Sequence, residues 1–287
     1  MDWVNAIVQG ILLGGLYALF AAGLSLIFGV MRLVNIAHGD LIVAAAYLAL
    51  VVVQLTGLHP LVSALVVVPL MALIGYGMQR LLLNPTIGKD LLSPLLVTFG
   101  ISVILQNGLL AVFTADSRRL AAGSIETASI QVLPGLHVGV LPLLMFVAAI
   151  VIIFGLERIF SRTSLGRAFR ATSDDPEVAQ LMMLDRAHVF GMAMALSAAV
   201  VAIAGIFLAI RTNFDPASGP ARLLFGFEAV IIGGLGNLWG TLAGGIVLGV
   251  AQAIGAQISP GWQILAGHLV FFLVLAIRPR GLFPRMD

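Results

Sequence analysis

The chain has 287 residues, of which 60% are hydrophobic and 10% charged, and its mean hydropathy is +1.10. An ordinary soluble domain carries about 25% charged residues, so this composition excludes that class and predicts an all-α polytopic membrane protein with a single transmembrane domain over residues 1–287. The net charge of +2 comes with fourteen arginines and one lysine scattered in loops, a distribution that fits orientation in a bilayer and gives no sign of nucleic-acid binding.

The first three spans follow one another closely. Residues 3–31 carry no charge and exceed the roughly 20 apolar residues that a spanning helix needs. After a polar interruption, a second span ends near residue 56 and a third covers 61–83. The interruption holds Asn35, His38 and Asp40. We favour the interpretation that these side chains satisfy free N–H groups at the start of the second helix, and the alternative is a site that lines a transport pathway.

Three further spans are expected over 91–113, 138–159 and 187–210, with a long loop over 114–137. Gln106 and Asn107 lie in the first of these spans. We expect both to form hydrogen bonds across helices, because unpaired amides in hydrocarbon are costly. Residues 211–222 are predicted to form a rigid outer loop, since Pro216 and Pro220 oppose helix formation.

A long polar stretch, residues 161–186, separates the fifth and sixth spans. The signals for a short helix in its second half are Asp174 or Asp175 as N-cap, Pro176 at the first helical position and Glu177 near the positive end of the dipole. The apolar residues expected on one face are Val178, Leu181 and Met182. Isolated helices below about 12 to 15 residues are marginal in water, so we expect a helix of about nine residues here to dock on another protein. The alternative is a solvated loop that only fixes topology.

The last apolar region, residues 229–277, contains no Asp, Glu, Lys or Arg. It is too long for one crossing, and Ser259-Pro260-Gly261 divides it. We expect a short or re-entrant helix over 223–235, a span over 238–258 and a final span that ends at 277. The total is about eight or nine membrane segments, including the broken helix.

A glycine-rich break divides the short helix from the span that follows. It contains Gly233, Gly234 and Asn237, and Glu228 precedes it. Broken helices in membranes require protein or a water-filled cavity around the freed backbone groups. We therefore expect these four residues to lie beside a transport pathway, and the alternative is that Glu228 caps locally or pairs with Arg222.

The distribution of positive side chains predicts the orientation. With alternating sides, the side of the 161–186 stretch has eight and the opposite side four: Arg32, Arg80, Lys89, Arg158, Arg162, Arg167, Arg170 and Arg186 against Arg118, Arg119, Arg211 and Arg222. By the positive-inside rule, that stretch is cytoplasmic and the N-terminus lies outside. Arg278, Arg280 and Arg285 join the cytoplasmic side if three passes follow Arg222, one of them incomplete.

Four segments that occur in order along nearly the whole chain carry a resemblance to a known family. They read GILLGGLYALFAAGLSLIFGVMRLVNIAHGDL, TSLGRAFRATSDDPEVAQLMMLD, GFEAVIIGGLGNLWGTLAGG and RPRGLF. Together they resemble the inner-membrane permeases of branched-chain (hydrophobic) amino-acid ABC importers. In that family the loop corresponding to 161–186 is the cytoplasmic coupling loop, and it ends in Leu-Gly-Ile, where this chain has Met182-Met183-Leu184.

The resemblance implies a permease subunit that moves branched-chain or related small solutes across the bacterial inner membrane. The implied partners are a second permease subunit, two cytoplasmic ATPase subunits that hold ATP and Mg, and a periplasmic solute-binding protein. No cofactor is expected in this chain. The resemblance does not identify the solute. Urea, short amides and aromatic acids are alternatives to amino acids.

Two other classes compete with an ATP-driven permease. A secondary carrier could use Asp40, Glu228 and His268 as an ion relay, although we favour capped or paired roles for these side chains. An intramembrane enzyme is disfavoured, because the sequence has no H-E-x-x-H motif and no cysteine. The chain also lacks a G-x-x-x-x-G-K-[ST] loop, so energy must come from a partner or an ion gradient. No catalytic or metal-binding residue is predicted.

Overall fold

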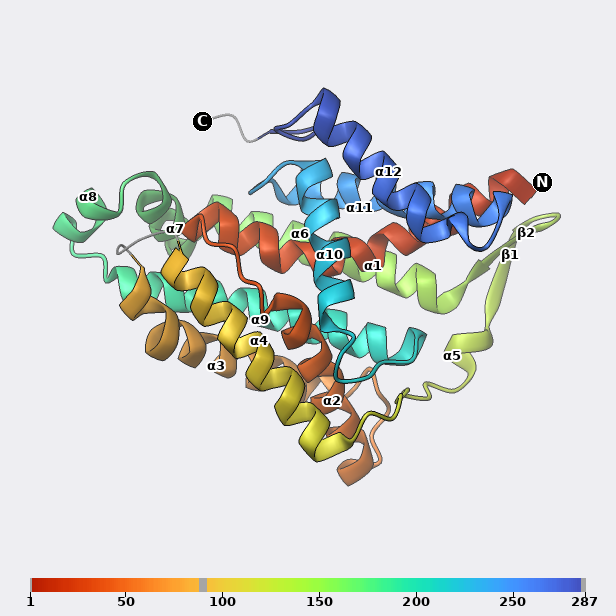
Figure 1. Cartoon of the computed structure of the whole chain (residues 1–287), viewed down its shortest axis with the longest axis horizontal. Helices are drawn as coiled ribbons and strands as arrows, with labels where there is room; N and C mark the ends of the chain where they lie inside the picture. The colour runs from red at the N-terminus through yellow and green to blue at the C-terminus, as the bar shows by residue number, and fades with distance from the viewer. Residues whose placement is uncertain (1, 88–91, 285–287) are drawn as a thin grey trace.

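The computed structural model of the protein describes residues 2–87 and 92–284, which are mostly helical (Figure 1). The main helices are α1 (Asp2–Met31), α2 (His38–Thr56), α3 (Ala64–Met78), α4 (Leu92–Phe113), α6 (Val140–Arg162), α9 (Arg186–Arg211), α10 (Gly219–Gly233), α11 (Leu238–Ile258) and α12 (Trp262–Ile277). The shorter elements are the π-helix η1 (Gln79–Leu83), the 3-10 helix η2 (Asn84–Thr86), α5 (Ser124–Thr127), α7 (Ser164–Asp174), α8 (Pro176–Leu181) and an antiparallel hairpin of β1 (Ser129–Leu133) and β2 (Leu136–Gly139). The predicted all-α class is confirmed.

Within the described residues, seven helices are long and apolar enough to cross a membrane. They are α1, α2, α3 with its continuation to Thr86, α4, α6, α9 and α11. The apolar helix α12 has 16 residues and α10 has 15. Counting these two shorter helices, the chain agrees with the expected eight or nine membrane segments, and α11 has the bounds predicted for it.

Three segments contain regular structure that the sequence did not predict. The 114–137 loop contains α5 and most of the hairpin, whose turn uses Pro134 and Gly135 at a φ of +84°. The first half of the 161–186 stretch is α7, which begins where the Thr163 side chain accepts a hydrogen bond from the Gly166 N–H. Pro220 does not oppose α10 but lies in its first turn, where the N–H that proline lacks would have no partner in the helix.

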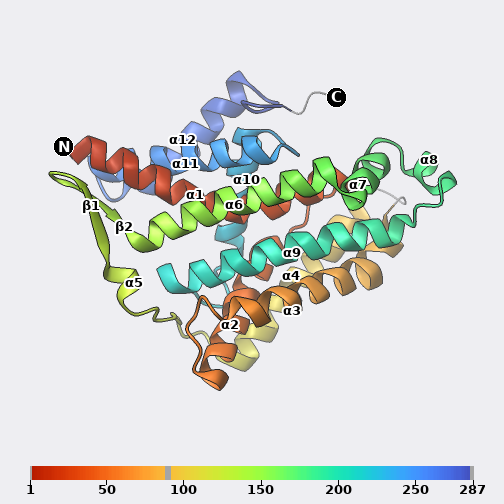
Figure 2. The ribbon, with the colours of Figure 1, turned by 180° about the vertical axis from the view of Figure 1, so that it is seen from behind.

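Helix α1 runs through the centre of the bundle. In its most apolar 18-residue window, 83% of residues are buried, against 11% in the corresponding window of α4. Helices α6, α9, α10 and α11 all pack on α1 (Figure 2). The outward surface of α4 has the character of a lipid-facing helix.

The contact between α1 and α11 brings two backbones together. A Cβ atom added to Gly14 would lie 2.5 Å from the Cα of Ile246, and one added to Gly249 would lie 2.6 Å from the backbone nitrogen of Gly14. Neither atom fits unless the helices move apart. In lipid, such close packing of small residues replaces the hydrophobic effect as the force between helices.

The two ends of the bundle carry different elements. Helices α7 and α8 lie at one end, while the N-terminus and the hairpin lie at the other (Figures 1 and 2). The Ser173 hydroxyl donates to the carbonyl of Gly29, 2.9 Å away, which fastens α7 to the end of α1. Arg280 lines a hollow with Asp174, so the last part of the chain returns to the α7 end. Of the positive residues that were counted, Lys89 and Arg285 lie outside the described residues.

We expect Gly14→Ala and Gly249→Ala each to lower the free energy of unfolding by about 1–3 kcal/mol, the usual cost of overpacking. Gly100→Ala is the matched control, because a Cβ added at Gly100 in α4 meets open space. It should leave stability unchanged or slightly raised, since alanine favours helix. Thermal unfolding of the detergent-solubilised variants measures both effects. Equal melting temperatures for all three variants would contradict the proposed α1–α11 contact.

Candidate functional site

The 161–186 stretch, which we name the coupling loop after the role predicted for it, forms two helices that differ in how they are held. Phe169 of α7 is fully buried, and Arg170 donates to the carbonyl of Phe160, so α7 is fastened to the bundle. Helix α8 lies beyond it at the end of the molecule (Figure 2). It has six residues, fewer than predicted.

The start of α8 follows the predicted capping pattern. One carboxylate oxygen of Asp175 accepts hydrogen bonds from the backbone N–H groups of Glu177 and Val178, both at 3.0 Å. Asp175 is therefore the N-cap, which confirms one of the two predicted candidates. Asp174 is the last residue of α7 and does not cap α8, because the chain turns only after it. Pro176 occupies the first turn with Glu177, as expected.

The apolar side chains of α8 are exposed. Val178 is 53% exposed, Leu181 82% and Met182 73%, whereas Ala179 is buried against the protein. A helix of this length cannot hold itself in water, and its exposed apolar face suits a protein partner. The docking role of these residues stays a prediction.

The end of α8 is a Schellman turn. The Leu184 N–H bonds to the carbonyl of Ala179, and the Met183 N–H to that of Gln180, at 3.1 and 3.0 Å. Met183 has a φ of +62° and a side chain that is 96% exposed. The turn thus takes the left-handed conformation that the glycine of the family pattern favours, with methionine at that position.

The interruption after α1 lies inside the protein. Asn35 and His38 are completely buried. The Asn35 side-chain oxygen accepts from the Ala37 N–H at 3.0 Å, but His38 Nε2 lies 2.8 Å from the carbonyl of Phe20 in α1. The capping interpretation is therefore wrong for His38, because the fold places the α1 backbone within its reach.

Asp40 also bonds across helices. Its two carboxylate oxygens accept from the Ser102 hydroxyl at 2.6 Å and from the Gln106 amide at 3.0 Å, both on α4. The expectation that Gln106 bonds across helices is confirmed. It is wrong for Asn107, which donates to the Val103 carbonyl of its own helix at 2.8 Å. The two amides differ because adjacent residues of an α-helix point in different directions from its axis.

Glu228 pairs with a residue far along the chain. It is 1% exposed, and its carboxylate contacts Nδ1 of His268 on α12. Local pairing with Arg222 is therefore wrong, although the broader expectation that Glu228 and His268 have paired roles is confirmed. The sequence did not indicate that the two pair with each other.

The break at 233–237 is confirmed, and protein surrounds it. α10 ends at Gly233 and α11 begins after Asn237, whose side chain accepts from the Gly240 N–H at 2.9 Å and donates to the Phe283 carbonyl at 3.0 Å. Gly234 has a φ of +108°, which glycine adopts readily. The C-terminal segment thus covers the break.

Two hollows connect the break to the coupling loop. One of 850 Å³ is lined by residues that include Arg32, Ser173, Asp174, Gly236 and Arg280. A second of 250 Å³ is lined by residues that include Glu157, Arg170, Gly236 and Asn237. The structure therefore brings the break and α7 together, while Asn35, His38, Asp40 and Glu228 lie away from these hollows.

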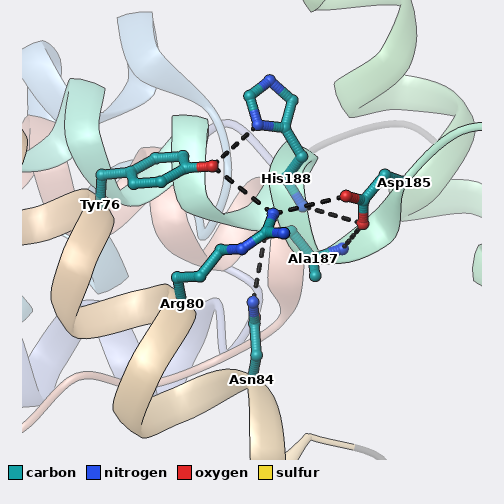
Figure 3. Close-up of polar contacts among 6 residues, drawn as sticks. All are labelled: Tyr76, Arg80, Asn84, Asp185, Ala187 and His188. Carbon is teal, nitrogen blue, oxygen red and sulfur yellow. Dashed lines mark hydrogen bonds and ion pairs between the residues drawn. The ribbon is translucent and has the colours of Figure 1, made fainter.

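A further polar cluster was missed by sequence reasoning. It joins Tyr76 to His188, Arg80 to Asp185 and Asn84 to the carbonyl of Ala187, next to the end of the coupling loop (Figure 3). A weak signal existed, because the charge count assigned Arg80 to the side of Asp185. Choosing this pair among the many charges on that side requires knowing that α3 packs on α9.

Comparison with known proteins places the chain among transport proteins. The profile of a family described as branched-chain amino acid transport system / permease component matches residues 6–277. The chain is 28% identical to the high-affinity branched-chain amino acid transport system permease protein BraD of Pseudomonas aeruginosa, with 99% of this chain and 97% of the relative covered. It is 26% identical to the corresponding protein LivH of Escherichia coli, over 99% and 96% of the two chains. No solved structure matches the chain.

We expect His268→Leu to lower the free energy of unfolding by about 3 kcal/mol, because removing one partner of a buried pair leaves the Glu228 charge without compensation. Adding Glu228→Gln to His268→Leu should recover part of this loss, since the amide carries no charge. Thermal unfolding of the two variants and the wild type measures the effect. An equal loss in the single and the double variant would contradict the pairing.

Proposed function

Because the chain belongs to the permease family of branched-chain amino acid transport systems, we propose that it imports branched-chain, hydrophobic amino acids as the membrane-spanning subunit of an ATP-driven ABC importer. The proposed solute is the one for which the relatives that match this chain almost end to end are named. The proposed partners are a second permease subunit, two cytoplasmic ATPase subunits that hydrolyse ATP, and a periplasmic solute-binding protein. The proposed location is the bacterial inner membrane.

The exposed apolar face of the short helix α8 is the observation that most supports an ATP-driven mechanism. A secondary carrier has no need for a short capped helix that exposes Val178, Leu181 and Met182 beyond the membrane-spanning bundle. An ATPase that docks on this face would shield the apolar area and give the helix the support that its length does not provide. Asp174, Asp175, Pro176 and Glu177 then serve to shape the coupling surface.

The proposed pathway residues fall into two groups. Gly233, Gly234 and Asn237 form the break, whose residues Leu235 and Gly236 line the 850 Å³ hollow while Asn237 lines the 250 Å³ hollow. The second group consists of the buried side chains Asn35, His38, Asp40 and Glu228. Buried polar side chains in a membrane-spanning bundle are costly and rare, which supports a place for this group beside the transport pathway.

Transport by the reconstituted chain tests the function directly. Proteoliposomes that contain the chain, its partner permease and the ATPases should take up leucine, isoleucine or valine only with ATP and the solute-binding protein. The chain reconstituted without the ATPases should show no uptake under an ion gradient. Gradient-driven uptake by the chain alone would establish a secondary carrier, and uptake of urea or aromatic acids in place of the aliphatic amino acids would replace the proposed solute.

The capping of α8 provides a sharper test of the coupling surface. Asp175→Ala removes an N-cap worth about 1 kcal/mol, enough to unsettle so short a helix. We expect weaker co-purification of the ATPases and less solute-stimulated ATP hydrolysis. Asp175→Asn is the matched control, because asparagine caps as well as aspartate. Wild-type values for Asp175→Ala would argue against docking through α8.

A further inference from the structure

Three side chains, one each from α3, η1 and η2, reach toward the start of α9 (Figure 3). Arg80 NH1 lies 3.4 Å from a carboxylate oxygen of Asp185 and 3.5 Å from the hydroxyl of Tyr76. The Tyr76 hydroxyl is 2.9 Å from Nδ1 of His188. Since arginine only donates, the Tyr76 oxygen accepts from Arg80 and its proton is available to His188 Nδ1. Asn84 adds a hydrogen bond to the carbonyl of Ala187 at 3.2 Å.

The Asp185 carboxylate makes two kinds of contact, one with the start of α9 and one with Arg80. One of its carboxylate oxygens caps α9 by accepting from the N–H groups of Ala187 and His188, at 2.9 and 3.2 Å. The other faces Arg80. These interactions lower the pKa of the Asp185 carboxyl, with the His188 N–H as the first cause and the Ala187 N–H and Arg80 contributing. The carboxylate thus joins the start of α9 to the end of the third span.

The π-helical turn η1 shapes the other side of this junction. The Asn84 N–H bonds to the carbonyl of Gln79, five residues back, and the Gln79 amide donates to the Asn84 side chain at 2.9 Å. This turn is wider than an α-helical one, and such turns occur often at functional sites. Arg80 and Asn84 both face α9 from it (Figure 3).

Helices α3 and α9 behave as one packed unit beside the junction. A Cβ atom added to Gly75 would lie 2.5 Å from Cβ of Ala198, and one added to Gly191 would lie 2.7 Å from the ring of Tyr76. Packing this close leaves little room for the two helices to slide. By contrast, α8 exposes most of its side chains, and only the turn at 182–184 separates it from Asp185. A displacement of α8 therefore passes along the chain to the start of α9 at Asp185.

We propose that Arg80 is a positioning residue for transport: it holds Asp185 and so transmits movement of α8 to the α3–α9 pair. This inference rests on the proposed function, because it assumes that ATPase subunits move α8. Arg80 and Asp185 are 43% and 58% exposed at their side chains, and pairs that exposed contribute little to stability. Loss of the pair should therefore affect coupling much more than folding.

The experiment compares Arg80→Gln and Asp185→Asn in the complete complex in proteoliposomes. Asparagine at 185 keeps the helix cap and removes only the charge. Both variants should assemble and keep basal ATP hydrolysis, while the number of solute molecules imported per ATP falls by about 2- to 30-fold, the range of known coupling effects. The double variant should fall no further than either single variant, because both remove the same contact.

Arg158→Gln is the matched control, since Arg158 is also an exposed arginine near the coupling-loop end, on α6. It should leave the import ratio at the wild-type value. An unchanged ratio in Arg80→Gln and Asp185→Asn, additive losses in the double variant, or an equal loss in Arg158→Gln would each overturn the proposal. If Arg80→Gln fails to assemble, Asp185→Asn decides the question alone. A wild-type complex that does not import with ATP refutes the proposed function, whereas normal wild-type import with unaffected variants refutes only the role of Arg80.

Discussion

Backbone groups that leave a helix inside a bilayer have no water to bond with, so protein must supply their partners. At the break between α10 and α11, the chain's own C-terminal segment supplies them. The N–H groups of Leu282 and Phe283 donate to the carbonyls of Ile232 and Gly233, at 2.8 and 3.1 Å, and Asn237 donates to the Phe283 carbonyl. The segment after α12 is therefore part of the break, and movement at one requires movement at the other.

The same requirement explains the interior polar side chains. The Asp40 carboxylate accepts hydrogen bonds from two residues of α4, and the His38 ring bonds to a backbone carbonyl of α1. These bonds connect α1, α2 and α4. Contact between apolar side chains does not by itself favour a neighbouring helix over lipid. Polar pairs therefore set which helices neighbour each other, and small residues such as Gly14 and Gly249 set how closely they approach.

Local signals in the sequence predicted local features well. Charge-free runs marked the spans, the glycine-rich segment marked the break, and Asp175 before Pro176 marked the start of α8. Partners were not predictable, because the ring of His268 reaches Glu228 only when α12 packs beside α10, forty residues away in sequence. Proline misled the interpretation at Pro220, since its effect depends on whether it falls within a helix or in its first turn.

The geometry of α8 follows mainly from its two ends, because only Ala179 of the helix is buried. Asp175 fixes the first turn, and the Schellman turn at Met183 fixes the last, at the cost of a left-handed conformation that methionine adopts less readily than glycine. The exposed Met183 side chain extends the apolar face formed by Leu181 and Met182, and methionine adapts well to irregular partner surfaces. Glycine there would ease the turn but remove that contact area. Once a docked partner supports the helix, the two caps fix its ends, so movement of α8 passes to the residues beyond the caps.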